Sequence, residues 1–131
     1  ASDLTSGATP DFVWITPNIC DDMHDCSTAT GDTWLHQWVP QILASSAWKQ
    51  NGALFITWDE GNDNNGCCQY ASGGQVATLV ISPLVRAGAR ASTPYDHYSL
   101  LRTICAAWGL TPPNHANDPA SAPITGIYTS A

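Results

Sequence analysis

Three short apolar runs have the composition of buried β-strands, because β-branched, aromatic and aliphatic side chains dominate each of them. The runs cover residues 12–16, 53–58 and 76–82. Pro17 ends the first run and Pro83 ends the third, since proline cannot donate to a ladder of hydrogen bonds. Polar, turn-rich segments follow the first two runs, at residues 18–25 and 62–74. We expect both segments to be loops at the carboxyl ends of their strands.

Between the first two runs, apolar residues recur at the three- and four-residue spacing of an amphipathic helix. They are Trp34, Leu35, Trp38, Val39, Ile42 and Leu43. Asp32 is a candidate cap for the start of this helix. Pro40 lies inside the pattern and lacks the N–H that a helix needs, so it predicts a kink or a break into two short helices near Val39.

A second helix is predicted over residues 98–108, with Asp96 or Thr93 as its cap. Gly109 ends it, and a pair of prolines follows. The order of elements is then strand, helix, strand, strand and helix. Because the strands are almost continuously apolar, this order predicts an α/β sandwich with a largely parallel sheet and flanking helices.

The length of 131 residues suits a single domain. Residues 1–10 and 114–131 have no hydrophobic period, and we expect them to be irregular peripheral segments. No apolar run approaches the roughly 20 residues of a membrane span. The start of the chain lacks the basic and apolar regions of a signal peptide, so we interpret the chain as mature or excised.

Charge and composition narrow the classes of function. The formal net charge is −7, which opposes binding to nucleic-acid phosphates, and we expect no nucleic-acid partner. Only 11% of the residues are charged, a composition more usual for exported proteins than for cytosolic ones. Five cysteines in a chain of this length indicate an oxidising compartment. We therefore expect a secreted, extracellular protein.

The cysteines also predict one cross-link. Cys20 and Cys26 are spaced to close a small loop, and we expect a disulfide between them. Cys67, Cys68 and Cys105 leave an odd thiol, so either one is free or its partner lies on a segment outside this chain. Their pairing does not follow from the sequence.

Asp59 and Glu60 directly follow the second apolar run and are the strongest candidates for chemistry. In open α/β sheets, ligands bind beyond the carboxyl ends of the strands. Two adjacent carboxylates raise each other's pKa unless a cation or hydrogen-bond donors compensate, and a hard divalent metal ion would do so. The competing interpretation is that the pair begins a solvated turn.

Two histidines are candidates for phosphate or acid–base chemistry. His24 lies beside Asp21, Asp22 and Asp25, where it could bind a metal, contact a phosphate or act as a general acid. On spacing alone, this loop is better interpreted as a solvated turn. His97 lies at the predicted helix start, where N–H groups and the helix dipole favour an anion such as phosphate. The alternative for His97 is a capping or buried hydrogen-bonded role.

Six blocks of sequence occur in the order found in one known family. They are Thr16-Pro17-Asn18, Asp22-Met23-His24-Asp25-Cys26, Gly31-Asp32-Thr33-Trp34-Leu35, Phe55-Ile56-Thr57-Trp58-Asp59-Glu60-Gly61, Val80-Ile81-Ser82-Pro83 and Tyr95-Asp96-His97-Tyr98-Ser99-Leu100-Leu101-Arg102-Thr103-Ile104. Together they resemble the phosphoesterase family of acid phosphatases and phospholipases C, within the alkaline-phosphatase superfamily. The resemblance extends from Phe12 to Leu110.

The resemblance implies an alkaline-phosphatase-like α/β fold and a phosphate monoester or diester as substrate. It implies that Asp59 and Glu60 bind a divalent metal ion, whose identity it leaves open. The residues that it places in the phosphate pocket are the catalytic candidates His24 and His97, with Asn18 and Asp22 nearby. In such enzymes a Ser or Thr nucleophile attacks phosphorus, and a histidine can protonate the leaving alkoxide.

The resemblance covers only the C-terminal half of the family's members, whose N-terminal half carries a Glu-Asn metal motif and the nucleophile. We expect the residues before Phe12 to supply neither, so the nucleophile is unknown. We therefore expect a partial domain that needs a missing N-terminal segment or partner chain for catalysis. The alternative is a non-catalytic secreted structural or binding module on the same scaffold, in which exposed strand edges drive self-assembly.

Overall fold

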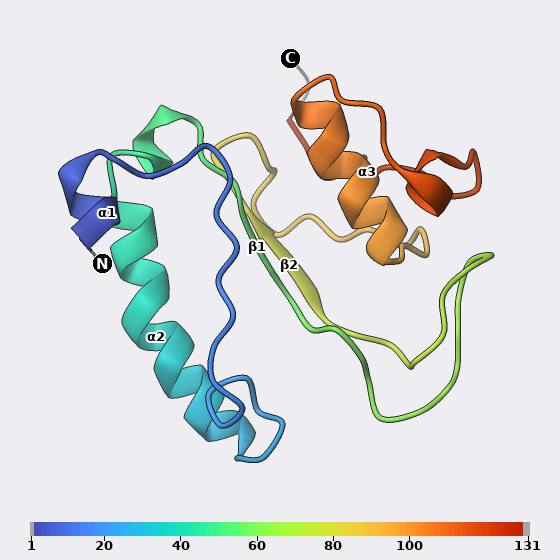
Figure 1. Ribbon diagram of the computed structural model, residues 1–131, viewed down its shortest axis with the longest axis horizontal. Coiled ribbons are helices and arrows are strands. Elements are labelled where there is room, and N and C mark those ends of the chain that lie inside the picture. Colours follow the sequence, from blue (N-terminus) through green and yellow to red (C-terminus); the bar gives the residue numbers. More distant parts are fainter. Residues whose placement is uncertain (1, 130–131) are drawn as a thin grey trace. The chain divides into compact units, whose positions relative to one another are not determined.

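The computed structural model describes residues 2–129 and divides the chain into two compact units, Ala1–Ala53 and Leu54–Ala131 (Figure 1). The first unit contains helices α1 (Ser2–Ser6) and α2 (Thr28–Ala44) and a 3-10 turn, η1 (Trp48–Gln50). The second contains strands β1 (Leu54–Thr57) and β2 (Thr78–Ile81), helix α3 (His97–Ala107) and a 3-10 turn, η2 (Asn114–Asn117). The described chain thus combines helix and strand, while its organisation as one domain stays a prediction.

Helix α2 contains the whole predicted apolar stripe, but it begins one turn earlier than expected. Its N-cap is Ser27, whose extended backbone precedes the helix, so the prediction that Asp32 caps it is wrong. The residues of this extra turn are small and polar and carry no apolar period, which is why the pattern did not include them. Pro40 lies inside a helix that continues to Ala44 and is not divided in two. Proline removes one N–H here, and the neighbouring turns maintain the helix.

Residues 12–16 do not form the predicted buried strand. They adopt no regular secondary structure, and the four apolar residues at positions 12–15 are 49–73% exposed. Within residues 2–129, ladder pairing joins β1 to β2 and, in one isolated bridge, Val85 to Tyr128. A β-prone composition describes a side chain's fit to a half-buried pleated surface, and such a surface requires a neighbouring strand. The prediction for this segment is therefore wrong.

Strands β1 and β2 form where the sequence predicts them and pair antiparallel, with Leu54 opposite Ile81 and Thr57 opposite Thr78. Parallel neighbours need a crossover connection, usually a helix. The chain between these two strands contains no helix and returns as a long hairpin (Figure 1). The predicted alkaline-phosphatase-like sandwich with a largely parallel sheet is therefore not confirmed.

Helix α3 confirms the second helix prediction to within one residue at each end. Its N-cap is Asp96 rather than Thr93, and the left-handed backbone of Gly109, with φ of 63°, follows its end. The buried apolar side chains of the described chain are Cys105, Ala116, Ile124 and Ile127. Because three of them come after α3, the C-terminal segment packs against this helix and completes a small core. The N–H of Ile124, for example, donates to Thr103 Oγ1 at 2.8 Å.

Candidate functional site

The predicted disulfide between Cys20 and Cys26 is present and closes the first candidate loop. Asn18 organises this loop, because its Oδ1 accepts the N–H groups of Cys20 and Asp21, each at 3.0 Å. Its Nδ2 donates to Asp21 Oδ2 at 2.8 Å. Both ends of the Asn18 amide are thus engaged in shaping the loop, and its role in a ligand pocket stays a prediction.

His24 is exposed and interacts with the next residue along the chain. Its Nδ1 lies 2.7 Å from Asp25 Oδ1, and the two side chains are 69% and 58% exposed. A contact between two side chains this exposed contributes little to the stability of a fold, because solvent screens it. The backbone N–H of His24 donates to Asp22 Oδ1 at 2.8 Å, so Asp22 helps to hold the turn. Roles for His24 and Asp22 in phosphate chemistry stay predictions.

The long loop between β1 and β2 begins and ends with two chain segments that are hydrogen-bonded to each other. Thr57 Oγ1 and Thr78 Oγ1 lie 2.9 Å apart at the strand ends. Farther out, the N–H of Gly61 donates to Gly73 O at 2.6 Å. A side chain at Gly61 would place its Cβ 2.9 Å from Gln75 O, so this approach of two backbones requires glycine. These contacts fix the chain on both sides of the two carboxylates that follow β1.

The structure brings His97 to the end of β1. Its Nε2 lies 2.7 Å from the backbone carbonyl oxygen of Asp59, 38 residues earlier in the chain. Because a carbonyl oxygen can only accept, Nε2 carries the proton, and in the neutral ring Nδ1 is the acceptor. Two of the predicted site residues are therefore neighbours, and Glu60 is next in the chain. The side chains of all three residues are exposed.

An anionic group already occupies the start of α3. Asp96 Oδ1 accepts the N–H of Ser99 at 2.8 Å and the Ser99 hydroxyl at 3.0 Å. A carboxylate at the N-cap satisfies the preference of a helix N-terminus for negative charge. A phosphate at this position would compete with Asp96, so any contribution of His97 to phosphate binding rests on its imidazole rather than on the helix dipole.

Asp59 and Glu60 do not complete a metal site with the side chains around them. Among residues 2–129, no group of three or more His, Cys, Asp or Glu side chains is placed to hold a metal ion. The two carboxylates are hard oxygen donors of the kind that Mg²⁺ and Ca²⁺ prefer, but such ions take about six or more ligands. The residues present therefore do not fit a complete site.

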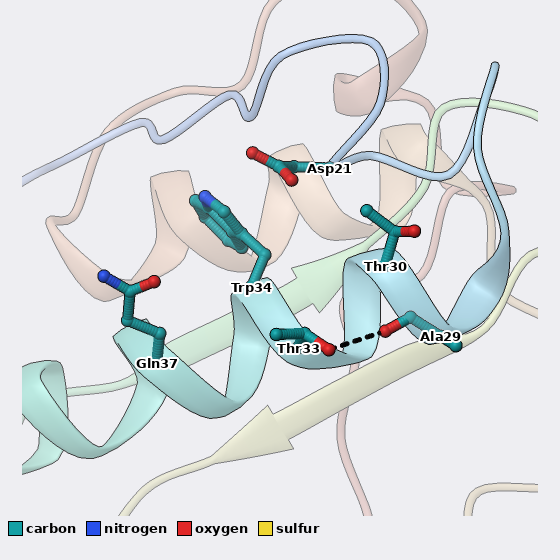
Figure 2. Close-up of a pocket in the computed structure, with 6 residues that line it drawn as sticks. All are labelled: Asp21, Ala29, Thr30, Thr33, Trp34 and Gln37. Carbon is teal, nitrogen blue, oxygen red and sulfur yellow. Dashed lines mark hydrogen bonds between the residues drawn. The ribbon is translucent and has the colours of Figure 1, made fainter.

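A separate cavity of about 480 Å³ lies on α2 and the loop before it (Figure 2). Its lining residues are Asp21, Ala29, Thr30, Thr33, Trp34 and Gln37. Figure 2 shows Trp34 and Gln37 projecting from the helix on the side where the loop carries Asp21. The hydroxyl of Thr33 is used within the helix, where it donates to Ala29 O at 2.8 Å. The lining includes no histidine and no predicted site residue, which distinguishes this cavity from the predicted site.

The structure contains an aromatic cluster that the sequence analysis did not predict. The rings of Tyr70 and His115 stack with their centroids 4.0 Å apart, and Tyr98 meets both nearly edge-on. The Tyr70 hydroxyl donates to Asp118 Oδ2 at 2.7 Å, across 48 positions of sequence. No local spacing could have indicated this cluster, because its members come from the long loop, α3 and the C-terminal segment.

The pKa shifts of Tyr70 and Asp118 agree with the hydrogen bond between them. The hydrogen bond to Asp118 raises the pKa of Tyr70 above its ordinary value, and desolvation adds to the effect. The pKa of Asp118 is lowered, first by the N–H of Ala120 and then by the hydrogen bond from Tyr70. Tyr70 is thereby held as a protonated donor and Asp118 as a charged acceptor.

The known proteins that are similar to this chain are named as phosphatases. The family model described as the Phosphoesterase family matches residues 1–111. An acid phosphatase of Aspergillus fumigatus is 27% identical over 111 residues, which are 82% of this chain and 24% of the relative. A phosphatidylinositol-3-phosphatase of Mycobacterium tuberculosis is 33% identical over 91% of this chain and 36% of the relative. A phosphate-repressible acid phosphatase of Penicillium chrysogenum is 27% identical over 82% of this chain and 26% of the relative.

The chain thus spans between 24% and 36% of the length of these relatives. No solved structure matches it with significance. None of the helices formed by residues 2–129 has the length and apolarity needed to cross a membrane.

Proposed function

We propose, because the chain belongs to the Phosphoesterase family, that it forms part of a phosphatase that hydrolyses phosphate monoesters or diesters. Relatives named acid phosphatase and phosphatidylinositol-3-phosphatase support this proposal. The structural observation that carries it is the 2.7 Å contact between His97 Nε2 and Asp59 O. Through this contact an imidazole lies at the strand end that carries two exposed acidic residues, and these are side chains that hydrolysis of a phosphate ester can use.

In this proposal His97 contacts the phosphate and acts as a general acid. With Nε2 donating to the Asp59 carbonyl, a second proton can enter the ring only at Nδ1. The Nδ1–H of the charged ring can then donate to a phosphate oxygen, or transfer its proton to the leaving alkoxide. Because the carbonyl fixes Nε2, it orients the ring and thereby sets the direction in which the second proton is offered.

Asp59 and Glu60 are proposed to contribute two oxygen ligands to a divalent metal ion. Such an ion, when bound, would polarise the phosphoryl oxygen. Family membership supports this role, and the pair of hard donors at one strand end agrees with it. Secretion is likewise proposed, supported by the disulfide between Cys20 and Cys26, since such bonds persist in oxidising compartments.

The imidazole role is tested by titrating the chain with inorganic phosphate and following its four histidines by NMR. Phosphate is expected to shift the His97 ring signals and to leave those of His115, in the aromatic cluster, unchanged. The variant His97→Gln should lose phosphate binding, whereas the matched control His115→Gln should retain it. A titration that shifts no histidine signal, or affects both variants equally, would rule out this role.

The carboxylates are tested by calorimetric titration with Mg²⁺ and Zn²⁺. Asp59→Asn and Glu60→Gln should each weaken binding, whereas Asp63→Asn, in the same loop, should not. If neither ion binds, or if Asp63→Asn has the same effect, the proposed ligands are wrong. Hydrolysis of an aryl phosphate and a phosphodiester with these ions is expected to be slow. Robust turnover that Asp59→Ala abolishes would show instead that the chain is catalytically sufficient.

A second candidate function is self-assembly without catalysis, and the exposed apolar run at residues 12–15 favours it. Trp14 is 73% exposed, the most of the four residues. Exposed apolar side chains can be buried against a second copy of the chain. Light scattering over a concentration series tests this idea. The mean mass should rise with concentration for the chain and not for Trp14→Ser, and a constant monomer mass would exclude assembly.

A further inference from the structure

We propose that Cys67 and Cys68 form a redox modification site, at which a disulfide oxidant converts the two adjacent thiols into a vicinal disulfide. Both cysteines are free thiols in the structure. Their Sγ atoms lie 2.7 Å apart. This distance is well inside the roughly 3.5–4.0 Å at which non-bonded atoms attract. The two sulfurs are therefore already close to the position from which a bond can form.

The backbone at this pair supports the proposal. Cys68 has φ of 63°, in the left-handed region that residues other than glycine seldom adopt. Neighbouring side chains on an extended chain point to opposite faces, which would separate the two thiols. Here the backbone of Cys68 is left-handed, and the Sγ atoms of Cys67 and Cys68 lie on the same side of the chain. Such backbone persists where the surrounding structure imposes it, and it is often found at functional sites.

Contacts on both sides hold the pair in place. Cys67 Sγ lies 3.5 Å from the carbonyl oxygen of Tyr95, in the segment that leads into α3. Tyr70, two residues after Cys68, is stacked on His115. The dithiol is therefore ordered by its surroundings rather than carried on a loose loop tip. Because the thiols are already together, closing the bond requires little further ordering of the chain.

The two thiols react in turn. Desolvation, the hydrogen bond with Cys67 and the charges of Cys67 and Asp96 raise the pKa of Cys68 to about 12. The thiolate of one cysteine attacks an oxidant disulfide, forms a mixed disulfide and releases one thiolate. The other cysteine then loses its proton and attacks the Sγ atom of the first, which expels the second thiolate.

The reaction conserves electrons and protons, and the disulfide that it forms is easily reduced. The two cysteines lose two electrons and two protons, and one oxidant disulfide becomes two thiols. Consecutive Cα atoms are about 3.8 Å apart, which is less than the roughly 4.4–6.8 Å spanned by ordinary disulfides. The Cα atoms of Cys20 and Cys26 are 4.8 Å apart, within that range. The vicinal bond is therefore expected to be reduced more readily than the bond between Cys20 and Cys26.

The test exposes the whole native chain to oxidised glutathione, then unfolds it, alkylates the remaining thiols and maps its peptides by mass. The peptide that contains Cys67 and Cys68 is expected to be lighter by two hydrogen atoms and to carry no alkyl group. Cys105 should be alkylated. A graded series of reductant should restore the two adjacent thiols before it opens the bond between Cys20 and Cys26.

Cys67→Ser and Cys68→Ser are the matched controls. Each variant retains one of the two thiols, which can form only a mixed disulfide and should appear as a glutathione adduct. If a variant fails to fold, the peptide map of the unsubstituted chain still decides the question. The proposal is overturned if both thiols remain open to alkylation, if both carry glutathione, or if either forms a bond to Cys105 or to a second chain.

Discussion

Replacing Asp96 measures how much of the stability of the second unit depends on the cap of α3. Asp96 Oδ1 accepts both the N–H and the hydroxyl of Ser99, and Ser99 is only 3% exposed. Loss of an N-cap costs about 1 kcal/mol. A buried hydroxyl that loses its acceptor costs about 1–3 kcal/mol more. We therefore expect Asp96→Ala to lower the free energy of unfolding by about 2–4 kcal/mol.

Urea unfolding followed by tryptophan fluorescence measures this change, and two further variants separate its parts. Asp96→Asn keeps an oxygen acceptor and removes the charge, so it should cost less than about 1 kcal/mol. In a chain that already carries Ser99→Ala, Asp96→Ala should cost only the cap, about 1 kcal/mol. The reasoning is refuted if Asp96→Ala costs no more than Asp96→Asn, or if its cost is the same with and without the Ser99 hydroxyl.

Cys20→Ser should lower the free energy of unfolding by about 2 kcal/mol, because cross-linking residues six positions apart removes that much chain entropy; an unchanged urea midpoint would contradict this. The raised pKa of Tyr70 gives stability that is complete below the ordinary pKa of 10.0 and is lost as the pH rises through the higher folded-state pKa. NMR titration of the Tyr70 ring should show that pKa falling in Asp118→Asn, and no fall would disprove the role of the carboxylate. Gly66→Ala would press its Cβ against the carbonyl oxygen of Ala71 and should cost about 1–3 kcal/mol in thermal unfolding, whereas unchanged melting would show that the turn relaxes freely.

The sequence pattern predicted those helices and strands that are determined by residues close to one another in the chain. Helix α3 could be predicted because its cap, Asp96, bonds to a residue three positions away and Gly109 follows its C-cap, Trp108. The direction in which β1 and β2 pair could not be predicted in this way. It depends on the path of residues 58–77, which have no hydrophobic period and contain no helix. The apolar run at residues 12–16 failed as a prediction for a related reason, since a strand depends on what lies beside it.

The candidate site was predictable in part. The disulfide between Cys20 and Cys26 followed from their short spacing. The rule that ligands bind beyond strand ends indicated Asp59, and its position at a predicted helix start, together with the resemblance to a family, indicated His97. That His97 contacts the backbone carbonyl of Asp59 could not be foreseen, because every residue carries such an oxygen and only the folded path of the chain selects one. The contact of Tyr70 with the distant C-terminal segment could not be predicted either, because it also depends on the folded path of the chain.

The packing of the C-terminal segment on α3 has a consequence for where this protein can be cut. The match to the family model ends at residue 111, yet Ala116, Ile124 and Ile127 lie beyond that point and are buried. A truncation at residue 111 would retain every proposed site residue and uncover the face of α3 that carries Cys105. The end of the family-model match is thus not the end of the packed core. A protease that removes residues after 111 should leave a fragment that is digested faster than the whole chain.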